Sequence, residues 1–311
     1  MAITASSPRA RAPDAPHSTN KLETIHTNEW MKQVARQARA EGRISGFVPT
    51  MGALHAGHMS LVRAAKAECQ PVIASIFVNP SQFAPNEDFQ KYPRTFESDR
   101  RQLEEAGVDY LFAPDAAEMY PPGFRTWVNV DGLSDRLDGR SRPGHFRGVT
   151  TVVLKLLEIV QPQKAFFGRK DAVQARLIRQ MARDLHLDTG IFVCPIVREP
   201  DGLAMSSRNT YLNPAERRAA TVLYRALDGA RRAIERGERD ALRLMAAMRE
   251  TLRAEPLVEI DYVEIVDEES LEQVTRLRGV CLAMVAARVG ATRLIDNMLI
   301  EERDGGFWTM L

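Results

Sequence analysis

The sequence of 311 residues contains no apolar run of about 18 residues, the length that a membrane-spanning helix needs. Its three cysteines, Cys69, Cys194 and Cys281, lie far apart and form no Cys-x-x-Cys pair. A disulfide framework and a thiolate metal site are therefore not expected, and the predicted location is the reducing cytoplasm. The 42 basic and 41 acidic residues nearly balance, which argues against a general binder of nucleic acid or of acidic membranes.

Several common catalytic and nucleotide-binding motifs are also missing. The chain has no G-x-x-x-x-G-K-[ST], no G-x-G-x-x-G, no H-E-x-x-H and no G-x-S-x-G. An enzyme that uses a nucleotide would need another way to bind its phosphates.

Residues 1–20 are rich in Ala, Pro and Ser and show no apolar periodicity. They lack the apolar segment of a secretory signal, and Pro8, Pro13 and Pro16 oppose an amphipathic helix. We expect a disordered tail here.

A regular alternation of strands and helices follows. Short apolar runs predict strands over 44–48, 72–78, 108–112, 165–167 and 191–197. Helical periodicity predicts helices over 59–69, 98–106, 149–160 and 172–186, with Ser98 as an N-cap. Strands that alternate with helices form parallel βαβ units. The sequence therefore predicts an α/β domain, built on a doubly wound parallel sheet, over residues 21–197.

The pattern changes beyond this point. Two helices are predicted over 214–236 and 240–254, followed by strands over 258–266, 280–288 and 292–300. This grouping predicts a smaller α+β domain over residues 198–311. The segment 214–254, which contains both helices, carries ten arginines against six acidic residues, which could suggest a nucleic-acid face. Solvated helix faces with i,i+4 ion pairs are the preferred interpretation, because the segment offers few aromatic side chains for base stacking.

The segment Pro49–His58, PTMGALHAGH, lies where a strand passes into a helix. His55 and His58 would face the same side of the first helical turn, beside unpaired backbone N–H groups. Gly52 and Gly57 would let a nucleotide approach the backbone. This arrangement suits phosphate chemistry, and a His-x-x-His metal pair and two unrelated histidines remain as alternatives.

Polar residues follow two other predicted strands. Asn79 and Gln82 come after the strand at 72–78, and their amides suit a substrate with hydroxyl and carboxylate groups, although they could equally stabilise a loop. The segment GRKDAVQ, 168–174, places Lys170 for phosphate, Asp171 for a cap, ribose or metal ion, and Gln174 one turn into a helix. The carboxyl ends of parallel strands are where such sheets bind ligands.

A further candidate lies in DGLAMSSRNTYL, 201–212. Ser206 and Ser207 offer hydroxyl and backbone donors, and Arg208 offers a guanidinium for phosphate oxygens. A capped helix start is the simpler explanation of Ser-Ser-Arg alone.

Taken together, these segments resemble a known family. The first and last resemble the His-x-Gly-His and Met-Ser-Lys signatures of nucleotidylyltransferases and class I aminoacyl-tRNA synthetases. The set PTMGALHAGH, FVNPSQF with EDFQKYPRT, RPGHFRGVTTVVLKL, FFGRKD with Gln174, REPDGLAMSSRNTYL and ARVGATRLIDN is similar, in this order, to the pantothenate synthetase (pantoate–β-alanine ligase) family from about Lys21 onwards.

The resemblance implies a Rossmann-like domain, a smaller C-terminal domain that closes over the nucleotide, and a homodimer. It implies a ligase that uses ATP and Mg²⁺, makes pantoyl adenylate from pantoate, and then passes the pantoyl group to β-alanine. No nucleic-acid or membrane partner is expected, and the Mg²⁺ ligands are not assigned. His58, His55, Lys170 and Arg208 would be catalytic, and Gln82, Gln174 and Asn79 would hold pantoate and β-alanine. The ATP site would comprise Met51, Gly52, Ala53, Leu54, His55, Ala56, Gly57, His58, Gly168, Arg169, Lys170, Asp171, Val197, Met205, Ser206, Ser207 and Arg208.

Two positions depart from the family pattern. Arg169 stands where the family usually has Glu, and Val173 where it usually has Gln. Arg169 would either strengthen ATP binding or point to solvent, and Val173 leaves pantoate affinity in question. A plain nucleotidylyltransferase, and a non-catalytic nucleotide- or RNA-binding module of the same fold, are the competing functional hypotheses.

Overall fold

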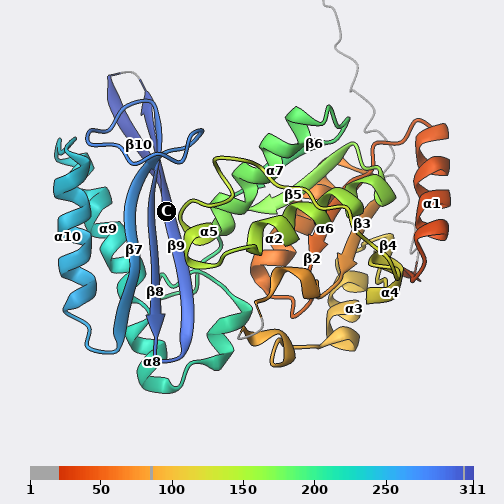
Figure 1. Ribbon diagram of the computed structural model, residues 1–311, viewed down its shortest axis with the longest axis horizontal. Coiled ribbons are helices and arrows are strands. Elements are labelled where there is room, and N and C mark those ends of the chain that lie inside the picture. The colour runs from red at the N-terminus through yellow and green to blue at the C-terminus, as the bar shows by residue number, and fades with distance from the viewer. Residues whose placement is uncertain (1–20, 85–86, 304) are drawn as a thin grey trace, which may run out of the picture.

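The computed structural model describes residues 21–84, 87–303 and 305–311, so the expected disordered tail lies outside the described residues. These described residues form two sheets, one of six strands and one of four (Figure 1). Within the described residues, no helix is both long and apolar enough to cross a membrane.

The larger sheet has the strand order β1-β4-β3-β2-β5-β6, and all its paired neighbours run parallel. This confirms the predicted doubly wound architecture. Its strands are β1 (Glu23–Ile25), β2 (Gly46–Thr50), β3 (Val72–Ile76), β4 (Tyr110–Phe112), β5 (Lys164–Gly168) and β6 (Gly190–Cys194).

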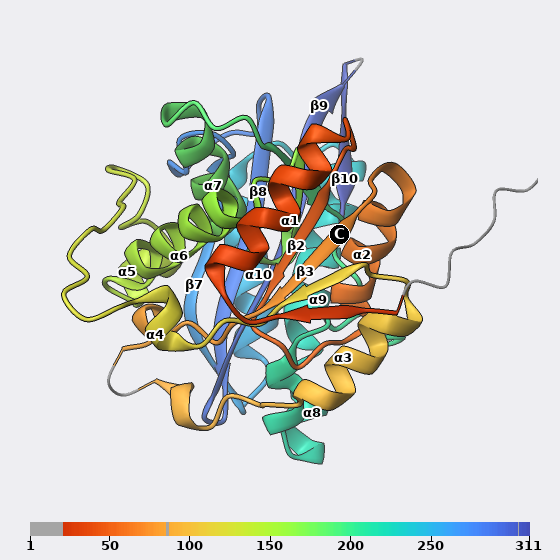
Figure 2. The same cartoon turned by 90° about the vertical axis from the view of Figure 1, so that its right-hand side faces the viewer.

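Helices cover both faces of this sheet (Figure 2). Adjacent residues of a strand point to opposite faces, so Val48 of β2 packs with Leu61, Val62 and Leu103 on one side, while Phe47 belongs to the core on the other. The first side carries α2 (Ala56–Glu68) and α3 (Phe96–Glu105), and the second carries α1 (Asn28–Ala40), α6 (His145–Val160) and α7 (Ala172–Asp184). Short helices occupy the connections: α4 (Ala116–Met119), α5 (Asp138–Ser141), and the 3₁₀ turns η1 (Pro80–Gln82), η2 (Asp88–Gln90) and η3 (Arg169–Asp171).

The second unit is an antiparallel sheet of order β10-β9-β8-β7, which confirms the predicted α+β character. Helices α9 and α10 pack on one of its faces. The boundary expected between residues 197 and 198 falls in the connection between the two sheets and stays a prediction. The elements are η4 (Ser207–Tyr211), α8 (Pro214–Ala219), α9 (Val222–Glu235), α10 (Ala241–Arg253), β7 (Val258–Asp267), β8 (Val280–Val289), β9 (Thr292–Arg303) and β10 (Gly306–Met310).

Some predicted elements differ from those observed. Ser98 is not an N-cap, because α3 already begins at Phe96 after Thr95. The single helix expected over 214–236 is two, since α8 ends at Ala219 and α9 begins at Val222. The pattern also missed α1, which the Thr27 side chain caps by accepting from the Trp30 N–H, and β10 at the end of the chain.

The strand order creates one point where the chain changes direction across the sheet. From β2 the chain continues to β3 and β4 on one side, and it later returns to place β5 against the other edge of β2. The segments that leave β2 and β5 therefore diverge, and a crevice opens beyond their carboxyl ends. His55 and His58 follow β2, and Lys170 follows β5.

Candidate active site

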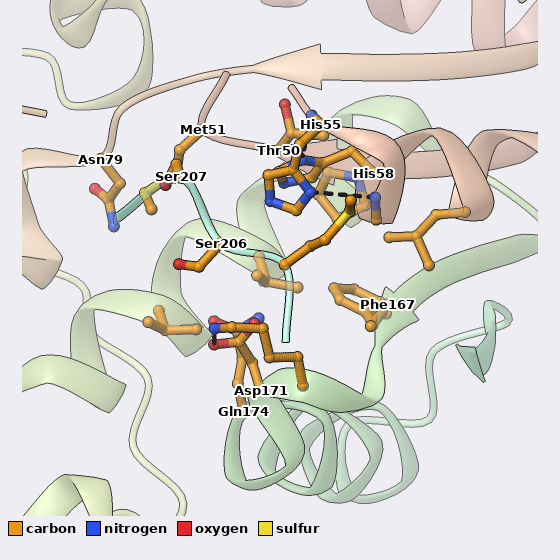
Figure 3. Close-up of a pocket in the computed structure, with 18 of the residues that line it drawn as sticks. Thr50, Met51, His55, His58, Asn79, Phe167, Asp171, Gln174, Ser206 and Ser207 are labelled. Carbon is orange, nitrogen blue, oxygen red and sulfur yellow. Dashed lines mark hydrogen bonds and ion pairs between the residues drawn. The ribbon is translucent and has the colours of Figure 1, made fainter. Parts of the chain in front are cut away.

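A cavity lies beyond the carboxyl ends of β2, β3 and β5, at this crossover (Figure 3). The two histidines line it from one side, and Asp171 and Gln174 line it from the other. Ser206 lies between these groups in the view, and Ser207 lies beside Met51 and Asn79. Segments from five regions of the sequence thus converge on one space, as the resemblance implies.

His55 and His58 form a reciprocal cap at the start of α2. The Nδ1 atom of His55 accepts from the Gly57 backbone N–H at 3.1 Å, and Nδ1 of His58 accepts from the His55 backbone N–H at 3.3 Å. An imidazole nitrogen that accepts carries no proton, so the proton of each neutral ring lies on Nε2. Burial lowers the pKa of both rings, that of His58 to about 3 with a further contribution from His55, so His58 is neutral near pH 7.

Gly57 has a steric reason to lack a side chain. A β-carbon at this position would lie 2.8 Å from Cε1 and 2.9 Å from Nδ1 of His55. The imidazole occupies the space above the Gly57 N–H because it accepts that hydrogen bond. Any larger residue would displace the ring.

Asp99 of α3 holds the turn before the histidines. Its buried carboxylate, 1% exposed, accepts from the Ala53 N–H at 2.8 Å and the Leu54 N–H at 2.9 Å. Ala53 has a φ of 52°, a left-handed conformation that costs energy for a residue with a β-carbon. The expected ATP-binding segment is therefore split: Met51, His55, Gly57 and His58 line the cavity, while Gly52, Ala53, Leu54 and Ala56 are not among its lining residues.

Asn79 and Gln82 line the cavity from the segment after β3. The Asn79 side chain is 1% exposed, and its Nδ2 donates to Gln82 Oε1 at 3.0 Å and to the Gly148 carbonyl at 3.2 Å. Its Oδ1 accepts from the hydroxyl groups of Ser81 and Tyr120, each at 2.9 Å. Asn79 therefore fixes the orientation of the Gln82 amide, which also donates from Nε2 to Met51 Sδ at 3.1 Å.

A second set of contacts holds the Gln82 backbone. Its carbonyl accepts from Nδ1 of His145 at 2.8 Å, so the His145 proton lies on that nitrogen and Nε2 accepts from Arg142 at 3.0 Å. Arg142 in turn pairs with both carboxylate oxygens of Glu87, at 2.6 and 2.8 Å. Burial, with the charge of Arg142, lowers the pKa of His145 to about 4.

After β5, the structure separates residues that stand side by side in the sequence. Gly168, Lys170, Asp171 and Gln174 line the cavity, whereas Arg169 does not. The Arg169 side chain is partly buried away from it, and burial together with the charge of Arg179 lowers its pKa. The expectation that Arg169 strengthens ATP binding or points to solvent thus gains no support from its position. Val173 is 1% exposed and packs in the main core.

The last polar segment passes close to the start of α2, since a β-carbon built on Gly57 would lie 3.9 Å from Cβ of Met205. Val197, Met205, Ser206, Ser207 and Arg208 all line the cavity. The Ser206 hydroxyl caps η4 by accepting from the Arg208 backbone N–H at 3.3 Å, as the simpler interpretation of Ser-Ser-Arg expected. The Arg208 guanidinium lies over the ring of Tyr92, 5.9 Å from its centre, and Tyr92 also lines the cavity.

Sequence reasoning missed the apolar wall of the cavity. Helix α6 contributes Val149, Val152, Val153 and Leu156, and the strand ends contribute Phe77 and Phe167. The predicted helix over 149–160 contained the four residues of α6, but it is apolar on nearly every face. A periodic pattern cannot tell which of its sides faces a cavity and which faces a core.

Two alternative interpretations lose support. Among the described residues, no group of three His, Cys, Asp or Glu side chains is placed to hold a metal ion, so the His-x-x-His pair has no third protein ligand. On α9, arginines pair with acidic neighbours: Arg231 contacts Asp228 and Glu235, and Arg232 contacts Asp228. These contacts match solvated helix faces with ion pairs.

Comparisons with known proteins show which family this chain belongs to. The pantoate-beta-alanine ligase family matches residues 23–299. Pantothenate synthetase of Acidobacterium capsulatum is 60% identical over 265 residues, covering 85% of this chain and 89% of its own. That of Heliobacterium modesticaldum is 57% identical over 280 residues, covering 90% of this chain and all of its own.

Solved structures are also similar to this fold. Pantothenate synthetase of Thermus thermophilus superimposes with a TM-score of 0.85 at 46% identity, covering 88% of this chain and 98% of that one. Pantoate-beta-alanine ligase of Francisella tularensis, solved with beta-gamma ATP and beta-alanine, gives 0.72 at 35% identity, covering 89% and 97%. With a family match over most of its length and relatives above half identity, this chain belongs to the pantoate-beta-alanine ligase family.

Proposed function

We propose that this protein condenses pantoate with β-alanine to form pantothenate, while ATP is converted to AMP and pyrophosphate. The observation that carries the proposal is the convergence of two neutral imidazoles, an ammonium, a guanidinium and three amides on one cavity. This donor set suits a triphosphate beside a hydroxy acid. The Francisella relative, crystallised with beta-gamma ATP and beta-alanine, supports the same pair of ligands.

In the first step, a carboxylate oxygen of pantoate attacks the α-phosphorus of ATP. A phosphorus–oxygen bond forms, the bond to the β-phosphate oxygen breaks, and pyrophosphate leaves with the electron pair. Negative charge grows on the phosphate oxygens, where the Nε2–H groups of His55 and His58 would donate hydrogen bonds. Lys170 and Arg208 would offset the same charge as fixed cations.

The neutral state of His58 limits its role. A ring with a pKa near 3 carries no second proton that it could give up at neutral pH, but its Nε2–H remains a hydrogen-bond donor. We therefore assign His58 hydrogen bonding to phosphate, in place of the acid/base role that the family resemblance implied.

Pantoate would bind between Gln82 and Gln174. Their amides can both donate to its carboxylate and accept from its hydroxyl groups. The wall of valines on α6 would contact its two methyl groups and keep water from the reactive adenylate. In the second step the neutral amine of β-alanine attacks the acyl carbon, AMP leaves with the electron pair of the broken bond, and the nitrogen loses a proton.

We also propose Mg²⁺ as the partner of ATP. Asp171 lines the cavity with a half-exposed carboxylate, 3.9 Å from the Lys170 ammonium. One carboxylate fits an ion that phosphate oxygens and water mainly coordinate, so Asp171 would hold it. When bound, the ion would neutralise charge on the phosphates.

A homodimer and a cytoplasmic location, which the family resemblance and the cysteine content predict, are part of the same proposal. Light scattering on the purified protein would test the dimer.

The decisive assay combines the purified protein with ATP, Mg²⁺ and pantoate. We expect exchange of labelled pyrophosphate into ATP that depends on pantoate, and release of AMP and pantothenate only after β-alanine is added. A final product that retains the adenylyl group would instead indicate a nucleotidylyltransferase. A protein that binds nucleotide or RNA without any exchange would indicate a non-catalytic module.

A further inference from the structure

Two adjacent polar residues of β9, Asp296 and Asn297, are almost fully buried, with 2% and 1% of their surfaces exposed. They lie in the smaller sheet, which stands beside the parallel-sheet domain (Figure 1). Neighbours on a strand point to opposite faces. Leu294 and Met298 pack with the cluster around α9 and α10, so Asp296, which lies between them in alternation, points to that face. Ile295 and Leu299 pack with the core of the parallel-sheet domain, and Asn297 points to that face with them.

Asn297 binds the backbone of the segment that carries Lys170. Its Nδ2 donates to the carbonyl of Arg169 at 2.9 Å and to the carbonyl of Lys170 at 3.0 Å. Both partners are acceptors, so only the NH₂ group of the amide can face them, and this fixes the orientation of the side chain. A carboxylate at the same position would offer an acceptor to two acceptors.

Asp296 binds the start of the segment that carries Arg208. Its carboxylate forms a two-pronged pair with Arg198, at 2.7 and 3.0 Å. Arg198 also donates to the Gly202 carbonyl at 3.0 Å and pairs as an antiparallel bridge with Ala204. This closes residues 198–204 into a hairpin that leads directly into Met205–Arg208.

From one strand, the two contacts therefore hold two separate segments that line the same cavity. Lys170 and Arg208 both line it, yet 38 positions separate them in the sequence. β9 lies inside its sheet, hydrogen-bonded to β8 and β10, and is a rigid base for both segments. Displacement of a phosphate-binding cation by about 1 Å can cost on the order of a hundredfold in rate.

We propose that Asp296 and Asn297 are positioning residues that set the separation of the Lys170 and Arg208 segments around the triphosphate. The inference rests on the proposed function for its kinetic consequence. Neither residue lines the cavity, so any effect of these side chains must pass through the segments that they hold.

The variants Asn297→Asp and Asn297→Ser test the amide. The Asp side chain has nearly the same shape as Asn but loses the NH₂ donor. The Ser side chain is shorter and keeps a hydroxyl donor, so Asn297→Ser still tests the proposal if a buried charge prevents the Asn297→Asp protein from folding. We expect kcat/KM for ATP in the exchange reaction to fall about 10- to 100-fold. Aminolysis of chemically prepared pantoyl adenylate by β-alanine should change less than about twofold, because that step uses no triphosphate.

Asp296→Asn should give the same selective loss. Glu264→Gln is the matched control, since Glu264 of β7 pairs at 2.6 Å with Arg140 of α5 and joins the same two units away from Lys170. It should lower thermal stability without changing ATP kinetics. Equal losses in both half-reactions, or unchanged ATP kinetics in folded Asn297→Ser, would overturn the proposal.

Binding of a non-hydrolysable ATP analogue, measured by calorimetry, separates this inference from the proposed function. If the wild-type protein binds the analogue but catalyses no exchange, the proposed function fails. In that case the dissociation constants of the ATP analogue still test the positioning role. Binding at least about tenfold weaker by Asn297→Ser than by the wild-type protein supports it, and equal binding contradicts it.

Discussion

Gly148 of α6 packs directly against the backbone of Ser81: a β-carbon on Gly148 would lie 2.4 Å from the Ser81 carbonyl oxygen and 2.8 Å from Cα of Gln82. Its carbonyl also accepts from Asn79. Gly148→Ala should therefore push the Asn79–Gln82 segment out of place, although alanine favours helices by about 1 kcal/mol over glycine. We expect the KM for pantoate to rise at least about tenfold, measured by initial rates at saturating ATP.

Gly229→Ala is the matched control for this prediction. Gly229 lies inside α9, and nothing comes within 4 Å of a β-carbon built there. Alanine should raise the free energy of unfolding by up to about 1 kcal/mol and leave the kinetics unchanged. A Gly148→Ala protein with normal pantoate KM would contradict the packing argument.

Asp99→Asn should weaken the turn that precedes His55. In the variant, the amide oxygen can accept from only one of the two N–H groups of Ala53 and Leu54. The NH₂ group of the amide then faces the other N–H group, and two donors cannot form a hydrogen bond. Loss of a buried, charge-assisted bond costs roughly 1–3 kcal/mol, so denaturant unfolding should show a loss of that size. Pantoate-dependent exchange should slow as well, because the same turn leads into the paired imidazoles.

Asp115→Asn provides the comparison for Asp99. Asp115 caps α4 by accepting from the Glu118 N–H at 2.7 Å, and it does not line the cavity. This variant should lose at most about 1 kcal/mol and retain full exchange activity. If Asp99→Asn lost stability but exchanged pyrophosphate at the normal rate, the turn would have no part in placing the imidazoles.

The buried His58 should make the protein less stable in mild acid. Its pKa is about 3 in the folded state, against about 6.5 in an unfolded chain. Below pH 6.5 the unfolded state takes up a proton that the folded state does not, so stability is lost as the pH falls toward 3. At pH 5 the loss from this group is about 2 kcal/mol.

His58→Asn should remove that part of the pH dependence. Free energies of unfolding from urea titrations at pH 7 and pH 5 would show a smaller decrease for the variant. His145, with a pKa near 4, and His55, whose pKa burial also lowers, contribute in the same direction in both proteins, so the difference reports His58. An equal decrease in both proteins would show that the pKa of His58 in the folded state is close to its unfolded value, and would contradict its burial in the neutral form.

Lys170→Gln should slow adenylate formation by on the order of a hundredfold, since it removes a charge that offsets the developing negative phosphate oxygens. Aminolysis of supplied pantoyl adenylate should be much less affected. Lys66→Gln is the control, because Lys66 contacts Asp109 at 3.8 Å and lies outside the cavity. Equal loss in both half-reactions would remove Lys170 from its proposed role.

Much of this architecture could be predicted from local patterns. The apolar runs at 72–78 and 165–167 and the periodic helix at 172–186 predicted parallel βαβ units, because strand and helix periods are properties of short stretches. The position of His55, His58 and Lys170 after strands also predicted that they share one edge of the sheet. The predicted ends of helices were less accurate, as Ser98 and the division between α8 and α9 show.

The sequence by itself determined the chemistry available: which imidazoles, amides and cations follow which strands. Only the tertiary structure decided that Arg169 turns away while Lys170 lines the cavity, that Gly148 must make room for Ser81, and that Asn297 reaches a carbonyl 127 positions earlier. The physical reason is that these relations depend on the order of strands in two sheets and on the packing between them. A local pattern fixes the face of one element, but it does not fix which distant backbone that face will meet.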